Sequence, residues 1–196
     1  ASDASELAAG VVATSLSPEL KSGLWPLCSS KRSAAMQTLL APDSALLART
    51  LLSPDDSISE QERISLREAA AGFQQFYDTV CSIRWSSLIS KRWLAPEHIN
   101  VLELRAALLA LHWALSFPSA IGCRVYLLLD STVALFSLWK GRSSSPALLL
   151  ILRKISAVLL AGGVSLLCGW VPSAVNPADA PSRLLHSSGP PGPEQF

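Results

Sequence analysis

The sequence lacks the closely spaced cysteines of a zinc site or a thiol-exchange centre. Its 4 cysteines, Cys28, Cys81, Cys123 and Cys168, lie far apart along the chain. Zinc fingers and dithiol enzymes need pairs only a few residues apart, so both classes are excluded. We expect reduced, buried thiols, which favours a location inside the cell, in the cytoplasm or the nucleus.

The chain also lacks an uninterrupted apolar run of the length that a transmembrane helix needs, which is about 20 residues. The best candidate, Ile155 to Val171, is interrupted by Gly162 and Gly163. Because glycine commonly ends helices, the pattern predicts a helix that stops at these glycines and a buried strand after them. We therefore expect no membrane partner.

An initiator methionine and a basic leader are missing as well, since the chain begins ASDAS. We expect that it was cut from a longer product and that any targeting signal lies outside it. With 196 residues, 49% of them hydrophobic, the chain is long enough for one sizeable core. The Pro- and Gly-rich end predicts a single domain over 1–185, followed by a disordered tail over 186–196.

Charge is scarce, with 16% of residues charged and a net charge of +1. It is also unevenly distributed. Residues 1–84 contain 7 basic and 10 acidic side chains, whereas residues 85–196 contain 9 basic and 5 acidic ones. A polyanion such as a nucleic acid is therefore expected to bind the second part of the chain.

The hydrophobic pattern predicts an α/β chain in which a mixed sheet packs against helices. Residues 1–14 predict two short strands, and residues 18–84 predict a helical insertion punctuated by prolines. Asn100 is expected to cap the first helix after the insertion. Beyond residue 84 the patterns predict strands over 85–93, 123–131 and 164–171, helices over 98–115, 132–141 and 143–163, and a short helical segment within 171–185.

Four acidic residues stand in apolar surroundings: Asp3, Glu103, Asp130 and Asp179. A buried carboxylate is costly unless it is paired or binds a metal, so a cluster of them needs a counter-charge. A hard cation such as Mg²⁺ meets that need. Taken singly, each residue has a simpler interpretation as a frayed terminal residue, an exposed helix-face residue, a helix cap or a turn residue.

Several motifs together resemble the ribonuclease H domain of retroelement polyproteins. These are SDAS leading to GVV, HINVLELRA, LLLDSTVAL with KGRSSS, and WVPSAVNPADAPSR. They are most similar to the tyrosine-recombinase retrotransposons of the DIRS and Ngaro kind, over residues 1–17 and 85–185. The resemblance implies a ribonuclease H-like fold: a five-stranded mixed sheet with helices on both sides and the helical insertion 18–84 between strands 2 and 3.

The resemblance also implies a function, which is cleavage of the RNA strand of an RNA/DNA hybrid during reverse transcription. Two Mg²⁺ or Mn²⁺ ions would be held by Asp3, Glu103, Asp130 and Asp179. The implied partners are the hybrid itself and the reverse transcriptase domain of the same polyprotein.

Two departures from the family keep other functions open. The loop before Asp179 lacks the histidine of cellular members, and the insertion is additional. The main alternative is a non-catalytic connection or nucleic-acid-binding module with the same fold, or a decayed copy. A transposase or integrase nuclease on this fold is a third possibility, and it explains NPADAPSR poorly.

Two groups of residues are candidates for contacts with nucleic acid. The first group flanks the acidic positions and would contact 2′-hydroxyl groups in the minor groove. The second is a basic, hydroxyl-rich turn where backbone N–H groups would meet a phosphate, although a solvated helix cap is an equal alternative. The candidates are Asn100, Ser131 and Thr132 in the first group and Lys140, Arg142, Ser143 and Ser144 in the second.

Overall fold

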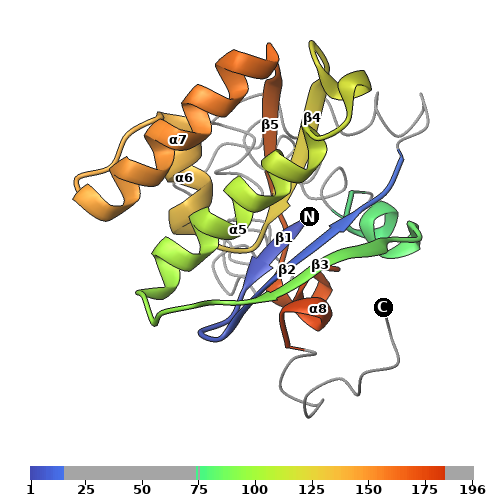
Figure 1. The fold of residues 1–196 in the computed structure, drawn as a ribbon. Helices are drawn as coiled ribbons and strands as arrows, with labels where there is room; N and C mark the ends of the chain where they lie inside the picture. The colour runs from blue at the N-terminus through green and yellow to red at the C-terminus, as the bar shows by residue number, and fades with distance from the viewer. Residues whose placement is uncertain (16–73, 75, 184–196) are drawn as a thin grey trace, which may run out of the picture.

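The computed structural model describes residues 1–15, 74 and 76–183 (Figure 1). Within them the chain is α/β and its elements follow the predicted order. Most of the predicted insertion and the tail lie outside the described residues. Residues 76–82, at the end of the predicted insertion, are helical. The other elements are β1 (Ser2–Ala4), β2 (Ala8–Ala13), β3 (Ser86–Arg92), α5 (Ile99–Ala114), η1 (Pro118–Ala120), β4 (Arg124–Leu129), α6 (Thr132–Lys140), α7 (Pro146–Gly162), β5 (Ser165–Trp170), η2 (Ser173–Val175) and α8 (Asp179–Arg183).

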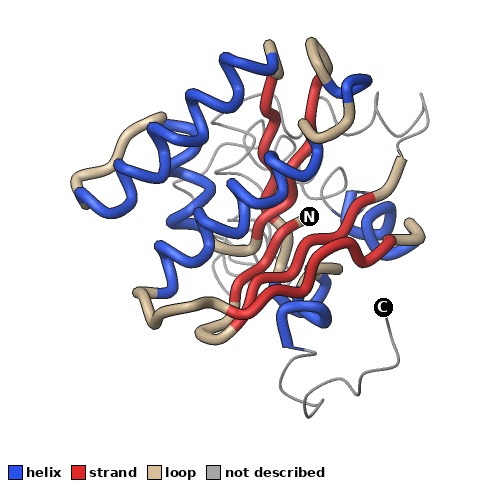
Figure 2. Tube along the Cα trace, in the orientation of Figure 1, coloured by secondary structure: helices blue, strands red, loops and turns tan. Residues whose placement is uncertain are grey.

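The strands form two hydrogen-bonded groups rather than the expected single five-stranded sheet (Figure 2). One group is the antiparallel sheet β1-β2-β3, and the other is the parallel pair β4-β5. Strand β1 lies beside β4, but no ladder of hydrogen bonds joins them in the described residues. Because β1 is only 3 residues long, it offers few backbone groups to a second neighbour.

Helices cover both faces of the three-stranded sheet (Figure 1). Successive strand residues point to opposite faces, so Asp3 and Ala4 face different helices. Ala4 packs with Ala9 against Leu102 and Ala106 of α5. On the Asp3 side, α8 crosses the sheet. The predicted arrangement of helices on both sides is therefore present around this sheet.

The helix ends explain where most of the predicted boundaries fall. Ser131 caps α6 by accepting a hydrogen bond from the Ala134 N–H, and α6 ends at Gly141, whose φ of 62° suits glycine. Helix α7 ends in the same way at Gly163. The predicted cap of α5 was wrong by two residues, because the His98 ring, and not Asn100, accepts the hydrogen bond from a first-turn N–H.

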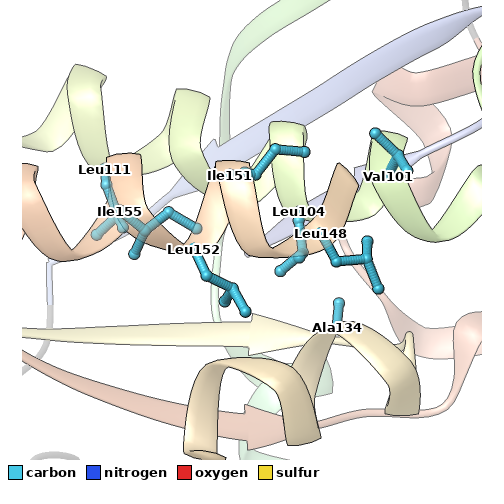
Figure 3. Packing of buried hydrophobic residues seen from close by; sticks show 8 residues of the cluster. All are labelled: Val101, Leu104, Leu111, Ala134, Leu148, Ile151, Leu152 and Ile155. Carbon is cyan, nitrogen blue, oxygen red and sulfur yellow. The ribbon is translucent and has the colours of Figure 1, made fainter. Parts of the chain in front are cut away.

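The helical layer is held together by an apolar cluster between α5, α6 and α7 (Figure 3). Burial of an aliphatic side chain of this size typically contributes about 1.5–3 kcal/mol. The cluster therefore fixes α5, and with it every side chain that α5 carries toward the strands. Its buried members are Val101, Leu104, Leu111, Ala134, Leu148, Ile151, Leu152 and Ile155.

The prediction that the cysteines are buried is only partly correct. Cys168 is buried as expected, but Cys81 and Cys123 are exposed, because they lie where elements end near the surface rather than inside the core. Cys28 lies outside the described residues.

Among the described helices, none is both long and apolar enough to cross a membrane, and the apolar run from residue 155 divides into α7 and β5 as predicted.

Glycine is required at position 10 because α8 rests directly on β2 there. A Cβ on Gly10 would lie 2.4 Å from the Ala178 carbonyl oxygen and 2.6 Å from the Ser182 nitrogen, both of them backbone atoms. Backbone atoms cannot rotate away as the end of a side chain can. Helix α8 therefore sits where it does only because β2 carries no side chain beneath it.

We predict that Gly10→Ala displaces α8 and lowers the free energy of unfolding by about 2–3 kcal/mol, as overpacking of a rigid contact does. Urea denaturation measures this change. Gly141→Ala is the control, because nothing lies within 4 Å of its Cβ and only its left-handed backbone is strained. We expect about 1 kcal/mol for the control; equal losses in the two variants would contradict the steric argument.

Candidate functional site

Three of the four predicted acidic residues come together. One carboxylate oxygen from each of Asp3, Glu103 and Asp130 lies within 4.8 Å of the others. The residues come from β1, from α5 and from the end of β4, so three separate parts of the chain supply the cluster. We call these three residues the acidic cluster.

Local structure explains each position in the acidic cluster. Asp3 lies in the middle of β1, opposite Gly10, and is only 4% exposed. Glu103 lies between Leu102 and Leu104, which are both fully buried, so the packing of α5 directs its carboxylate inward. Asp130 directly follows β4, and its carbonyl oxygen accepts a 2.8 Å hydrogen bond from the Trp170 indole.

The cluster is electrostatically strained without a counter-charge. Burial, together with the charges of Asp130 and Asp3, raises the pKa of Glu103 from 4.5 to about 9. Burial is also the main cause that raises the pKa of Asp3 from 3.8 to about 6, and Asp130 and Asp179 add to the effect. A hydrogen bond with Ser182 acts in the opposite direction at Asp3. Proton or cation binding therefore relieves the repulsion.

Two oxygen atoms of the cluster point to a cation. Glu103 Oε2 and Asp130 Oδ1 are buried and have no hydrogen-bond partner among the described residues. Such orphaned acceptors are rare in folded proteins. A set of carboxylate oxygens without nitrogen or sulfur suits Mg²⁺ or Mn²⁺. The residues present therefore fit a hard divalent cation.

Asp179, the fourth predicted acidic residue, borders the cluster without joining it. It begins α8, and its Oδ1 accepts a 2.8 Å hydrogen bond from Arg183 Nε in an ion pair. Its charge reaches Asp3, as the effect on the Asp3 pKa shows. Asp179 is thus placed at the rim, where its carboxylate can face a bound cation or a phosphate.

The cluster opens into a cavity of about 520 Å³. Among the described residues that line it, Arg183 is the one cation, at the edge and 68% exposed. The mixture of carboxylates, hydroxyls and one guanidinium suits a charged, hydrated ligand. The described lining consists of Asp3, Ala4, Ser5, Glu103, Asp130, Ser173, Asp179, Ser182 and Arg183.

A larger cavity of about 860 Å³ lies between β2, β4 and the end of α5. Its described lining is mostly apolar and includes no carboxylate. Size alone would favour it, but its described lining gathers no group of carboxylates that could hold a divalent cation. The smaller acidic cavity is therefore the candidate functional site.

The predicted nucleic-acid contacts lie outside the described lining of the acidic cavity. Ser131 and Thr132 directly follow Asp130, and the Ser131 hydroxyl is used to cap α6. Asn100 lies in the first turn of α5. The basic turn is separate: Lys140, Arg142 and Ser144 are exposed, and the Ser143 hydroxyl accepts a hydrogen bond from the Ser145 N–H.

Sequence reasoning missed Asn176 and Ser182, two buried polar residues behind the cluster. The Ser182 hydroxyl lies 2.5 Å from Asp3 Oδ2, and Asn176 Nδ2 lies 3.5 Å from Asp3 Oδ1. The signal was available, because both residues belong to the segment NPADAPSR. Its aspartate attracts attention because it is charged, whereas a serine or an asparagine in such a segment is typical of an ordinary turn.

The raised pKa values predict how stability depends on pH without divalent metal. A carboxyl whose pKa is higher in the folded state stabilises the fold below its unfolded pKa, and this stability is lost as pH rises. For Asp3 the loss runs through about pH 6, and for Glu103 through about pH 9. Thermal unfolding in EDTA should therefore show a falling melting temperature between about pH 4 and 9.

Glu103→Gln should remove most of the fall in melting temperature with rising pH. It should also raise the free energy of unfolding of the metal-free protein at pH 8 by about 1–3 kcal/mol. Glu97→Gln is the matched control, just before the same helix. Glu97 is paired with Arg105, and that hydrogen bond lowers its pKa, so its contribution stays constant between pH 6 and 9. An unchanged slope in Glu103→Gln would show that Glu103 is not buried among like charges.

Comparison with known proteins adds no relative for this site. The chain matches no protein-family model, and no curated protein or solved structure is significantly similar to it.

Proposed function

We propose that this chain is a metal-dependent endonuclease of the ribonuclease H type that cleaves the RNA strand of RNA/DNA hybrids. The observation that carries the proposal is the acidic cluster. Three carboxylates from β1, α5 and the end of β4 meet without a basic partner among the described residues, and two of their oxygens lack any described hydrogen-bond partner. Such a group is costly to bury unless a proton or a cation neutralises it, and the two orphaned oxygens favour a cation.

The order of elements supports a ribonuclease H-like fold. An antiparallel sheet of three strands precedes α5, and a parallel pair of strands follows it, linked by α6 and α7. Strand β1 lies beside β4, and hydrogen bonds between these two strands would join the two groups into a five-stranded mixed sheet. In such a sheet the acidic cluster would lie near the centre, with Asp3 on β1, Asp130 at the end of β4 and Glu103 on the adjacent helix α5.

The chemistry divides among the residues of the cavity. Asp3, Glu103 and Asp130 would hold Mg²⁺ or Mn²⁺, with Asp179 available at the rim. Two such ions, when bound, supply an activated water and stabilise the leaving 3′ oxygen. Arg183 is placed to exchange its bond with Asp179 for a bond with a phosphate. The buried strands and α5 keep the carboxylates in fixed positions.

Selectivity for RNA would come from contacts with the 2′-hydroxyl, which distinguishes RNA from DNA. Ser131 and Thr132 follow the cluster directly, and Asn100 lies on the same helix as Glu103. The basic turn with Lys140 and Arg142 offers a second contact with the backbone of the hybrid. In an element of this kind the neighbouring reverse transcriptase domain would supply the hybrid, in the cytoplasm or the nucleus.

The proposal predicts cleavage of the RNA strand of an end-labelled hybrid in Mg²⁺ or Mn²⁺. Asp130→Asn and Asp3→Asn should each lower the rate at least about 100-fold, because each removes a metal ligand. Asp78→Asn is the matched control. Asp78 accepts a hydrogen bond from Gln74 at the surface and lies outside the described lining of the cavity, so its variant should keep the parent rate.

Other outcomes distinguish the alternatives. Binding of the hybrid without cleavage, by a folded chain that also binds no metal, would favour a non-catalytic nucleic-acid-binding module. Cleavage of both strands would contradict selectivity for RNA. A rate that Asp130→Asn leaves unchanged would exclude the acidic cluster as the site.

A further inference from the structure

Helix α8 packs against one row of residues that runs across the three-stranded sheet. Asp3 of β1 is opposite Gly10 of β2, and Gly10 is opposite Ser90 of β3. Helix α8 contacts all three. Its Ser182 hydroxyl reaches Asp3, its backbone rests on Gly10, and its Pro181 carbonyl accepts a 2.7 Å hydrogen bond from Ser90. The helix is therefore fixed at both ends of this row.

Ser182 has one hydroxyl proton and two acceptors within reach. Its Oγ lies 2.5 Å from Asp3 Oδ2 and 2.8 Å from the Asp179 carbonyl oxygen. An ionised carboxylate is the stronger acceptor, so the proton is directed to Asp3 when that residue is charged. Ser182 is 0% exposed, which means that water cannot replace this bond.

Asn176 holds the start of the same segment. Its Nδ2 donates to the Ser2 carbonyl at 3.3 Å and lies 3.5 Å from Asp3 Oδ1, while its Oδ1 accepts from the Ala178 N–H. The contact with Asp3 is long, so its main effect is to hold the segment against β1. Ser182 is then the close donor to Asp3.

We infer that Ser182 is a positioning residue that fixes the Asp3 carboxylate for cation binding, and that α8 serves the site through this bond as well as through Asp179. The inference rests on the proposed metal site. With Oδ2 held by Ser182, the carboxylate cannot rotate freely, and its remaining lone pairs stay directed toward Glu103 and Asp130. Residues behind metal ligands commonly change affinity about 10- to 100-fold when they are removed.

The row itself provides a matched pair of variants. Ser182→Ala removes the bond to Asp3, whereas Ser90→Ala removes another side-chain anchor of α8 and touches no carboxylate. Calorimetric titration with Mn²⁺ and Mg²⁺ measures affinity directly, without substrate. We expect Ser182→Ala to weaken cation binding about tenfold and Ser90→Ala to stay within about twofold of the parent. Both variants should lose a similar amount in melting temperature.

A second readout separates positioning from folding. For hybrid cleavage, Ser182→Ala should lower kcat about tenfold and leave the dissociation constant of the hybrid unchanged, and higher Mn²⁺ should restore the rate. Ser182→Cys, of similar size but a weaker donor, should fall between parent and Ser182→Ala in cation affinity.

The outcomes that overturn the inference differ from those that overturn the proposed function. Equal cation affinity in Ser182→Ala and Ser90→Ala, with cleavage by the parent intact, would leave the nuclease standing and reduce Ser182 to a structural contact. No binding of Mn²⁺ or Mg²⁺ by the folded parent would remove the metal site and the role of Ser182 together.

Discussion

The burial of three clustered carboxylates, together with their mutual repulsion, is the constraint on which the structure depends. Asp3, Glu103 and Asp130 lie within cation-binding distance of one another, and burial raises the pKa of Asp3 and of Glu103. Hydrogen bonds from Ser182 to Asp3 and from the Ala4 backbone to Glu103 offset part of this effect, and among the described lining residues Arg183, at the edge, carries the one positive charge. Until a proton or a cation neutralises the carboxylates, other interactions in the fold must offset the cost of keeping them together.

Apolar packing on both sides of the cluster provides this stabilisation. Glu103 is held by Leu102, which packs against the alanines of β1 and β2, and by Leu104, which belongs to the cluster shared with α7. Glu103 therefore lies between Leu102, which packs against the strands, and Leu104, which packs against α7. Moving the carboxylate out of the site would require α5 to lose one of these contacts, and each contributes about 1.5–3 kcal/mol.

Local features of the fold can be predicted from the sequence, whereas contacts between distant segments cannot. Periodicity and glycines locate α6, α7 and β5. Apolar neighbours draw attention to Asp3, Glu103 and Asp130, but they do so equally for Asp179, which does not join the cluster. The division of the strands into two groups depends on how β1 and β4 meet, which no local pattern records. Ser182 is missed for the same reason, since its bond to Asp3 joins residues 179 positions apart.

Because α8 is short, its position depends on its contacts with β1 and β2. A helix of 5 residues is not stable by itself, so its position must come from its contacts with the sheet. Those contacts are made over Gly10 and to Asp3, beside the carboxylates themselves. Asp179 and Ser182 therefore reach the site only when β1 and β2 are paired in register. The position of Asp3 in turn depends on Ser182, so the first and last segments of the described chain complete the site jointly.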